Sequence, residues 1–162
     1  MQATYIQNVT DGLWYPWQCI GTGQDVTLAC VGAGVPTPPP YIPTASEPLV
    51  SLAAYLVGTR QTALQGITQE EWAWFAVGIS DLVEMYCNYS WRINAVAVPA
   101  RLQQIVARMI KADIDQAQKS ERFKSENMTN YSYTMQDVIN PNDIVSQYKN
   151  ALAPFRVLFV GM

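Results

Sequence analysis

Five prolines within eight residues limit what this sequence can fold into. They are Pro36, Pro38, Pro39, Pro40 and Pro43. Because proline has no backbone N–H and a fixed φ angle, neither a helix nor a central strand can continue through them. The uncharged stretch 26–46 is long enough to cross a bilayer, but no membrane-spanning helix would carry so many prolines, and we expect no membrane partner. The run therefore predicts a stiff, extended spacer.

Residues 1–45 predict a β-rich N-terminal arm that ends in this spacer. Two β-prone runs, 14–20 and 26–31, flank a glycine-containing turn at 21–25, a pattern typical of a β-hairpin. A lone hairpin is only marginally stable, so we expect the arm to pack on its own helical domain or on a neighbouring chain. The first basic residue is Arg60, so we expect no export signal. The candidates for contacts to a neighbouring chain are Trp14, Tyr15 and Trp17.

Residues 46–154 predict a mainly α domain of four helices. Apolar residues recur at helical spacing in the segments 46–57, 68–88, 99–122 and 140–153. Ser46 is a candidate N-cap for the first helix, with Pro48 in its first turn. Thr68 and Glu71 form a capping box for the second helix. Pro99 stands at a favoured position to open the third helix, and Pro154 ends the fourth.

Two further segments depart from the helical pattern. Apolar and polar side chains alternate over residues 123–135, which predicts two short strands or one bent extended segment. After the fourth helix, residues 157–160 are four consecutive apolar residues, and we expect no further chain to cover them. We therefore expect residues 155–162 to form a docking tail in which 157–160 add a strand to a partner protein or fill a groove on it. We also expect that the helical domain does not need residues 157–162.

The charges are few and are sorted by sign. Charged residues make up only 14% of the chain, which suggests that other chains cover much of the surface. Residues 46–91 carry one basic and five acidic groups, net −4, whereas residues 92–124 carry seven basic and three acidic groups, net +4. Two interpretations stay open. Copies of the chain pack side by side with opposite charges facing, or the second and third helices pair within one molecule.

The residue types argue against an enzyme and against a metal or cofactor. The chain has no histidine, which removes histidine-based nucleophile systems and histidine-ligated metal sites. Its three cysteines lack metal-binding spacing, and we expect buried free thiols, although Cys19 and Cys30 could pair across the hairpin. Asp81 and Glu84 lie three residues apart on one helix, but nothing else completes a site, so we interpret them as a solvated face.

The basic and aromatic residues favour contacts with proteins over nucleic acid. The formal net charge is −3, whereas a protein that grips a phosphate backbone needs a basic footprint. Arg101, Arg108 and Lys111 form a short stripe, which we interpret as a solvated face or a subunit contact. The tryptophans at 72, 74 and 91 are expected to anchor the core or an interface. Trp74 is the better interface candidate because it lies off the apolar stripe of its helix.

Several segments together resemble the head–tail adaptor (connector) proteins of tailed bacteriophages. The resemblance covers residues 47–157, and its pieces follow one another in the family's order. They are Leu49 to Leu56, Thr68 to Glu71, Ile79 to Cys87, Val98 to Ala100, Phe123 to Thr134, and Pro154 to Arg156. The most specific piece is 123–134, in which the residues that match a segment after the family's third helix are Lys124, Ser125, Glu126, Tyr131, Ser132 and Thr134.

The resemblance implies a structural virion protein without catalysis. Identical subunits, a dodecamer by family expectation, would form a ring under the portal protein. The ring would extend the DNA channel and present a docking surface for the stopper or tail protein, and genomic DNA would pass without specific binding. The protein would reside in the virion neck, and in the host cytoplasm during assembly.

The resemblance also assigns contact residues. Portal docking is assigned to the tail residues Phe155, Arg156, Val157, Leu158, Phe159 and Val160. Contacts between subunits or toward the next ring are assigned to Lys124, Ser125, Glu126, Asn130, Tyr131 and Tyr133. Two alternatives stay open: another neck ring such as a stopper or tail terminator, which is usually β-rich in its core, and a small non-viral helical protein-binding module.

Overall fold

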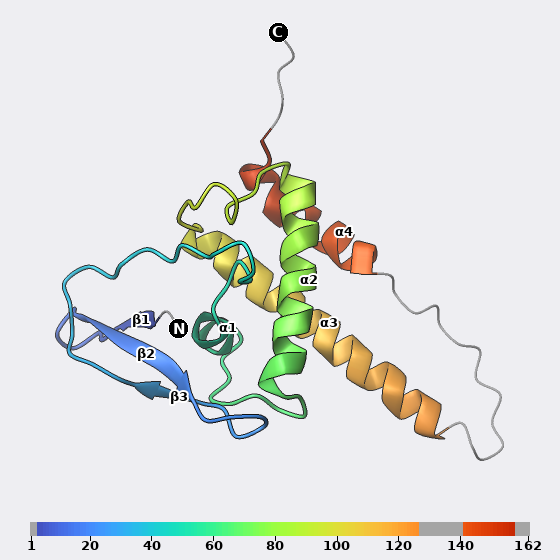
Figure 1. Cartoon of the computed structure of the whole chain (residues 1–162), viewed down its shortest axis with the longest axis horizontal. Coiled ribbons are helices and arrows are strands. Elements are labelled where there is room, and N and C mark those ends of the chain that lie inside the picture. Colours follow the sequence, from blue (N-terminus) through green and yellow to red (C-terminus); the bar gives the residue numbers. More distant parts are fainter. Residues whose placement is uncertain (1–2, 127–140, 158–162) are drawn as a thin grey trace, which may run out of the picture.

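Four α-helices and a three-stranded antiparallel sheet make up the described part of the chain in a computed structural model (Figure 1). It describes residues 3–126 and 141–157, with the backbone alone for 120–126 and 141–143. The strands are β1 (Thr4–Gln7), β2 (Trp14–Ile20) and β3 (Thr27–Cys30). The helices are α1 (Leu52–Gly58), α2 (Gln69–Cys87), α3 (Ala100–Glu126) and α4 (Pro141–Leu152), followed by the short 3-10 helix η1 (Ala153–Phe155).

The predicted hairpin is confirmed, and a further strand joins it. β2 pairs with β3 in antiparallel register, and β1, which the sequence pattern did not indicate, pairs with the other edge of β2. Gly21 begins the β2–β3 turn with φ of +108°, and a Cβ there would lie 2.1 Å from the Asp25 carbonyl oxygen. Only glycine fits this turn. Cys19 lies opposite Leu28 rather than Cys30, and both cysteines are free. Cys30 is exposed, so the expectation of a buried thiol was wrong there.

The capping box predicted for α2 is confirmed. The Glu71 backbone N–H donates to the Thr68 hydroxyl over 3.2 Å, and the Thr68 N–H donates to the Glu71 carboxylate over 2.7 Å. Two of the free donors at the start of the helix are satisfied in this way. The helix ends at Asn88, whose backbone is left-handed, with φ of 55°. α4 agrees with the predicted fourth helix, although Asn140 lies outside the described residues.

Two predicted boundaries were wrong. The first helix begins at Leu52 with Ser51 as its N-cap, not with Ser46. Leu49 explains the difference because its side chain is fully buried and its backbone N–H donates to the Ser80 hydroxyl over 2.9 Å, which holds the preceding segment outside the helix. α3 continues to Glu126, so residues 123–126 are helical rather than extended. The rest of the predicted excursion, 127–135, lies outside the described residues.

α3 is the central element of the core. It packs against α1, α2 and α4, and in Figure 1 it crosses behind α2. The α3 side chains that are fully buried are Leu102, Val106, Ala107, Met109 and Ile110. Burying large apolar side chains from four helices around one such axis supplies the main driving force for the helical part of the fold.

The sheet packs on its own helical domain, which was one of the two expected alternatives. Val26, at the end of the β2–β3 turn, is 1% exposed and belongs to the helical core. The free edge of β3 is taken by the α1–α2 connector: the Leu28 N–H donates to the Thr62 carbonyl over 3.1 Å, and Thr27 bridges to Ala63. The Thr4 and Ser51 hydroxyls are 2.8 Å apart. The N-terminal sheet is therefore continuous with the helical core.

Candidate interaction surfaces

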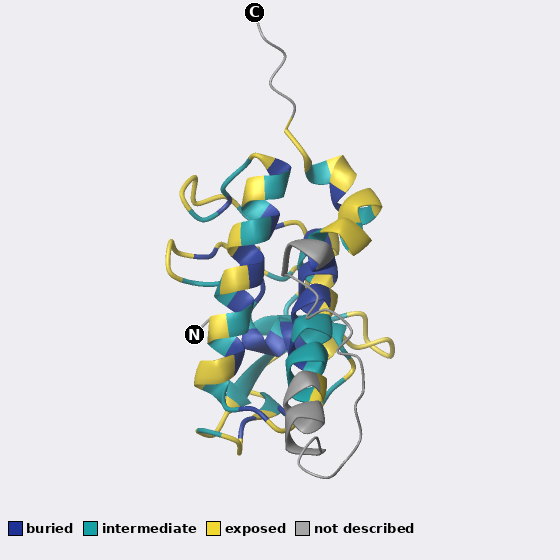
Figure 2. Ribbon diagram, turned by 90° about the vertical axis from the view of Figure 1, so that its right-hand side faces the viewer, coloured by how far each residue is buried: buried dark blue, intermediate teal, exposed yellow. Residues whose placement is uncertain are grey.

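The outward face of α2 carries a row of exposed residues at helical spacing. The row is Glu70, Trp74, Gly78, Asp81 and Met85. Trp74 is 74% exposed and Met85 is 77% exposed, although both side chains are large and apolar. Figure 2 shows exposed and buried faces on opposite sides of α2. We call this row the α2 face. Two large apolar side chains on one exposed helix face make this face a candidate interaction surface.

The tryptophans divide between the core and this surface. Trp72 is 4% exposed and Trp91 is 6% exposed, so both are core residues. Trp74, the interface candidate from sequence, is on the α2 face and packs edge-on against Phe75, with ring centroids 5.1 Å apart. Sequence reasoning missed Met85, although its position three helical turns after Trp74 could have revealed it.

Arg92 lies beside the α2 face and pairs with the two carboxylates of that helix. Its side chain is 8% exposed, and its Nη2 donates to Glu84 over 2.7 Å and also to Asp81. Its Nε donates to Glu84 over 3.0 Å. Burial alone would lower the pKa of Arg92, but the hydrogen bonds to Glu84 and Asp81 outweigh it and raise the pKa. Glu84 is thus a buried ion-pair partner, not part of a solvated face, and this arrangement offers no free acid or base.

The ion pairs of Arg92 also test whether the acidic segment 46–91 and the basic segment 92–124 pair within one molecule. An acidic segment does pair with a basic one inside the molecule, but Arg92 comes from the loop after α2 rather than from α3. Next to it in that loop, Ile93 is 81% exposed. Lys111 pairs within α3 with Asp115, over 2.9 Å. No ion pair between α2 and α3 occurs among the described residues, so the predicted pairing of those two helices was wrong there.

The outward face of α3 is basic. Arg101, Arg108 and Lys119 are exposed, and none of them makes an ion pair with a described residue. They recur at intervals of seven and eleven residues, which is two and three helical turns, so they lie along one side of the helix. Gln104 is exposed in the same row, and Asp115 lies in it between Arg108 and Lys119, with its carboxylate paired to Lys111. We call this row the α3 face.

The first residues of the C-terminal tail contact their own chain. Phe155 packs against the core, and the Arg156 guanidinium lies 5.6 Å from the centre of the Tyr86 ring. The Val157 N–H donates to the Cys87 carbonyl at the end of α2 over 2.8 Å. Val157 is therefore held to its own domain through its backbone, and the expectation that this domain does not need residues 157–162 stays a prediction. Leu158, Phe159 and Val160 lie outside the described residues, and portal docking stays a prediction.

The described candidates for contacts to a neighbouring chain lie in the N-terminal arm and at the end of α3. Trp14 exchanges two backbone hydrogen bonds with Val35, and the Tyr15 hydroxyl donates to Asp11 over 2.7 Å. Both residues therefore make hydrogen bonds within the N-terminal arm. A hydrogen bond from the Leu13 N–H, together with the one from Tyr15, lowers the pKa of Asp11. Trp17 is half-buried in β2. Lys124, Ser125 and Glu126 form the last residues of α3, whereas Asn130, Tyr131 and Tyr133 lie outside the described residues.

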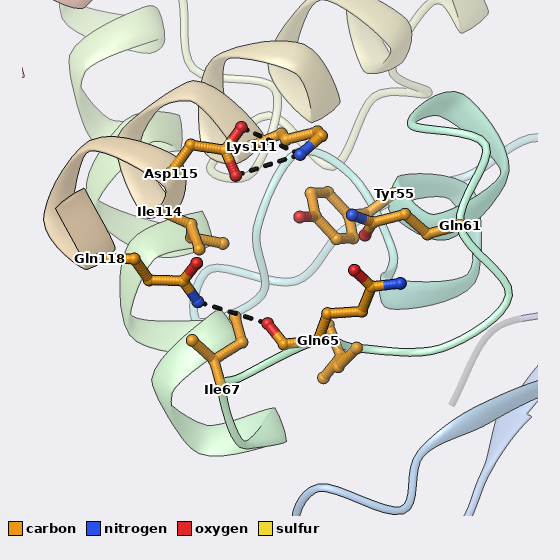
Figure 3. A pocket seen from close by; sticks show the side chains of 9 residues that line it. Tyr55, Gln61, Gln65, Ile67, Lys111, Ile114, Asp115 and Gln118 are labelled. Atoms are coloured by element: carbon orange, nitrogen blue, oxygen red, sulfur yellow. Dashed lines mark hydrogen bonds and ion pairs between the residues drawn. The ribbon is translucent and has the colours of Figure 1, made fainter. Parts of the chain in front are cut away.

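A small hollow lies between the α1–α2 connector and α3 (Figure 3). The Gln118 amide donates to the Gln65 carbonyl over 3.3 Å, and the Lys111–Asp115 pair stands beside the Tyr55 ring. Burial raises the pKa of Tyr55 to about 12, so its hydroxyl stays protonated. The hollow has a volume of about 60 Å³. Pockets for small organic ligands have volumes of about 300–1,000 Å³, so this hollow suits water rather than a substrate.

The described residues contain no cluster of metal-binding side chains, and no described helix is long and apolar enough to span a membrane. Burial raises the pKa of the Cys19 and Cys87 thiols to about 11, which leaves them unreactive at neutral pH. Comparison of the chain with protein-family models, with curated proteins and with solved structures gave no match. Among the features of the described residues, the α2 face and the α3 face are therefore the candidate functional surfaces.

Proposed function

We propose that this chain is a structural head–tail adaptor of a tailed bacteriophage, a subunit of a ring that sits under the portal and presents a surface for the stopper or tail. The observation that carries the proposal is the α2 face with its neighbouring loop. Trp74, Met85 and Ile93 are each more than 70% exposed. Exposing three such large side chains costs solubility unless another chain covers them. In a protein that functions as a subunit of an assembly, a neighbouring chain covers these side chains.

The order of elements also supports this proposal. Five of the six segments that resemble the adaptor family fall on α1, on the two ends of α2, on the start of α3 and just after α4, whereas segment 123–134 begins within α3 and continues outside the described residues. The core of the described residues is helical, and the sheet lies at its edge. A stopper or tail terminator, usually β-rich in its core, is therefore a weaker candidate. The ion-paired state of Glu84 and the small hollow give no support to a catalytic role.

The experiment is native mass spectrometry of the purified chain over a range of concentrations, with and without the portal ring of the same virus. We expect a large closed assembly, alone or on the portal, whose mass, after subtraction of the portal's own mass where it is present, is a multiple of 18.1 kDa. Subunits that associate weakly in solution assemble only when the portal holds them together, which is why both arms are needed. A monomer that ignores the portal at every concentration would refute the adaptor and favour a small helical protein-binding module.

A further inference from the structure

We infer that the α2 face of one copy binds the α3 face of the next copy, and that this single contact, used repeatedly, builds the assembly. The inference rests on the proposed ring, because only repeated use of the same two faces closes a circle. The partner is a second copy of this chain. An interface between two different surfaces of identical subunits is heterologous, and it forms a ring when the rotation between copies closes.

Charge complementarity is the first argument for a second copy. The α2 face carries the exposed carboxylates of Glu70 and Asp81, and Glu71 is exposed beside them. Asp81 keeps 57% of its side chain exposed despite its contact with Arg92. The α3 face offers the three exposed cations that no described carboxylate pairs. Faces of opposite sign on one molecule attract each other between copies and repel their own kind.

The spacing of the charges is the second argument. Glu70 and Asp81 are eleven residues apart on α2, and Arg108 and Lys119 are eleven residues apart on α3. Eleven residues are about three helical turns, so each pair spans about 16 Å along one side of its helix. The two pairs can therefore meet at the same time when the helices lie side by side. Trp74 lies between the carboxylates, one helical turn from Glu70, where the apolar stem of the cation that pairs with Glu70 can cover its ring.

Gly78 is the third argument. It lies in the middle of α2 and in the middle of the α2 face, and a Cβ there would meet no atom within 4 Å. Glycine inside a helix costs about 0.5–1 kcal/mol relative to alanine. No contact in the described chain requires this glycine. A helix of the next copy that approaches closely at this point would require it.

The inference is tested with two variants, each of which destroys one face. Trp74→Ser removes the apolar anchor from the α2 face without adding a charge, and Arg108→Glu reverses the α3 face, so the two altered faces gain no attraction for each other. Lys149→Glu is the matched control, because Lys149 is an exposed cation on α4, a helix that belongs to neither face. Circular dichroism checks that all three fold like the wild type. Self-association is measured by sedimentation velocity at low and high salt.

We expect each face variant alone to associate at least about tenfold more weakly than wild type, and the control to be unchanged. An equimolar mixture of the two variants should form a 1:1 dimer that grows no further, because one intact α2 face meets one intact α3 face. Added salt should weaken the contact. Where the wild type assembles only on the portal, the variants and their mixture should fail to close a ring there, whereas the control closes one.

Other outcomes would overturn the inference. Face variants that assemble like wild type would show that these surfaces are not the contact, while a ring formed by the wild type would leave the adaptor proposal standing. Variants that stay monomeric even when mixed would show that the contact is not heterologous. A wild type that is monomeric both alone and with the portal would overturn the adaptor and this inference together.

Discussion

Replacing Arg92 with alanine tests how the end of α2 is held. The Arg92 side chain is 8% exposed and its partner Glu84 is 10% exposed, so the substitution leaves a buried carboxylate without its cation. Breaking a buried ion pair from one side costs about 3–5 kcal/mol. Asp81 is more than half exposed, so water screens its attraction to Arg92, and the loss of this contact adds little to the cost. We therefore expect a loss of about 3 kcal/mol, which is roughly 6–12 °C in Tm for a chain of this length.

The assay is urea unfolding followed by circular dichroism, with Arg60→Ala as the control. Arg60 is exposed and makes no ion pair with a described residue, so its replacement should change the free energy of unfolding by less than about 0.5 kcal/mol. Adding Glu84→Gln to Arg92→Ala removes the orphaned charge and should recover more than half of the loss.

Two results would refute this reasoning. A loss below about 1 kcal/mol for Arg92→Ala would mean that water reaches Glu84 and that the pair behaves like a surface salt bridge. A double variant no more stable than Arg92→Ala would mean that the loss comes from the packing of the arginine stem and not from an unpaired charge.

Three further predictions concern other parts of the fold. Val26→Ala should lower the free energy of unfolding by about 1–3 kcal/mol in urea, because the side chain is 1% exposed in the core; a change below about 0.5 kcal/mol would show that the sheet is independent of the helices. Gly78→Ala should raise the Tm of the monomer, by an amount equivalent to about 0.5–1 kcal/mol, since its Cβ meets open space; a lower Tm would reveal a contact inside the chain. Burial raises the pKa of Asp113, so wild-type stability should fall as the pH rises from the ordinary Asp pKa through the raised one. Asp113→Asn should remove this fall, and identical pH profiles of the two proteins would contradict the assignment.

Local signals in the sequence were enough where the deciding interaction is itself local. Thr68 and Glu71 satisfy each other's backbone within one turn, so the start of α2 could be predicted from four residues. The β2–β3 hairpin was equally accessible, because its turn and both of its strands are contiguous. The position of Trp74 outside the buried side of α2 followed from helical periodicity alone.

The predictions that were wrong depend on distant contacts or on short patterns. Ser46 and Ser51 are equivalent N-caps in sequence, and the choice is made by Leu49, which is bonded to Ser80 thirty-one positions away. The alternation of apolar and polar residues at 123–126 covers too few residues to indicate a strand where the preceding helix α3 continues through them. The acidic and basic segments of the sequence indicated that charges pair, but the pairing of Arg92 with Glu84 depends on the fold of the loop after α2. Met85 and Ile93 are single exposed apolar residues, which sequence patterns do not separate from core residues.

The hydrogen bonds between β3 and the α1–α2 connector have a consequence for synthesis on the ribosome. Thr27 bridges to Ala63, so the strand leaves the ribosome about 36 residues before its neighbour. At translation rates of about 5–20 residues per second, the edge of β3 waits roughly 2–7 s for its partner. A hairpin forms within microseconds, so β2 and β3 can pair early in that interval, and whenever they are paired the edge of β3 is open. The nascent N-terminus is thus exposed to strand exchange with neighbouring nascent chains until the connector is made.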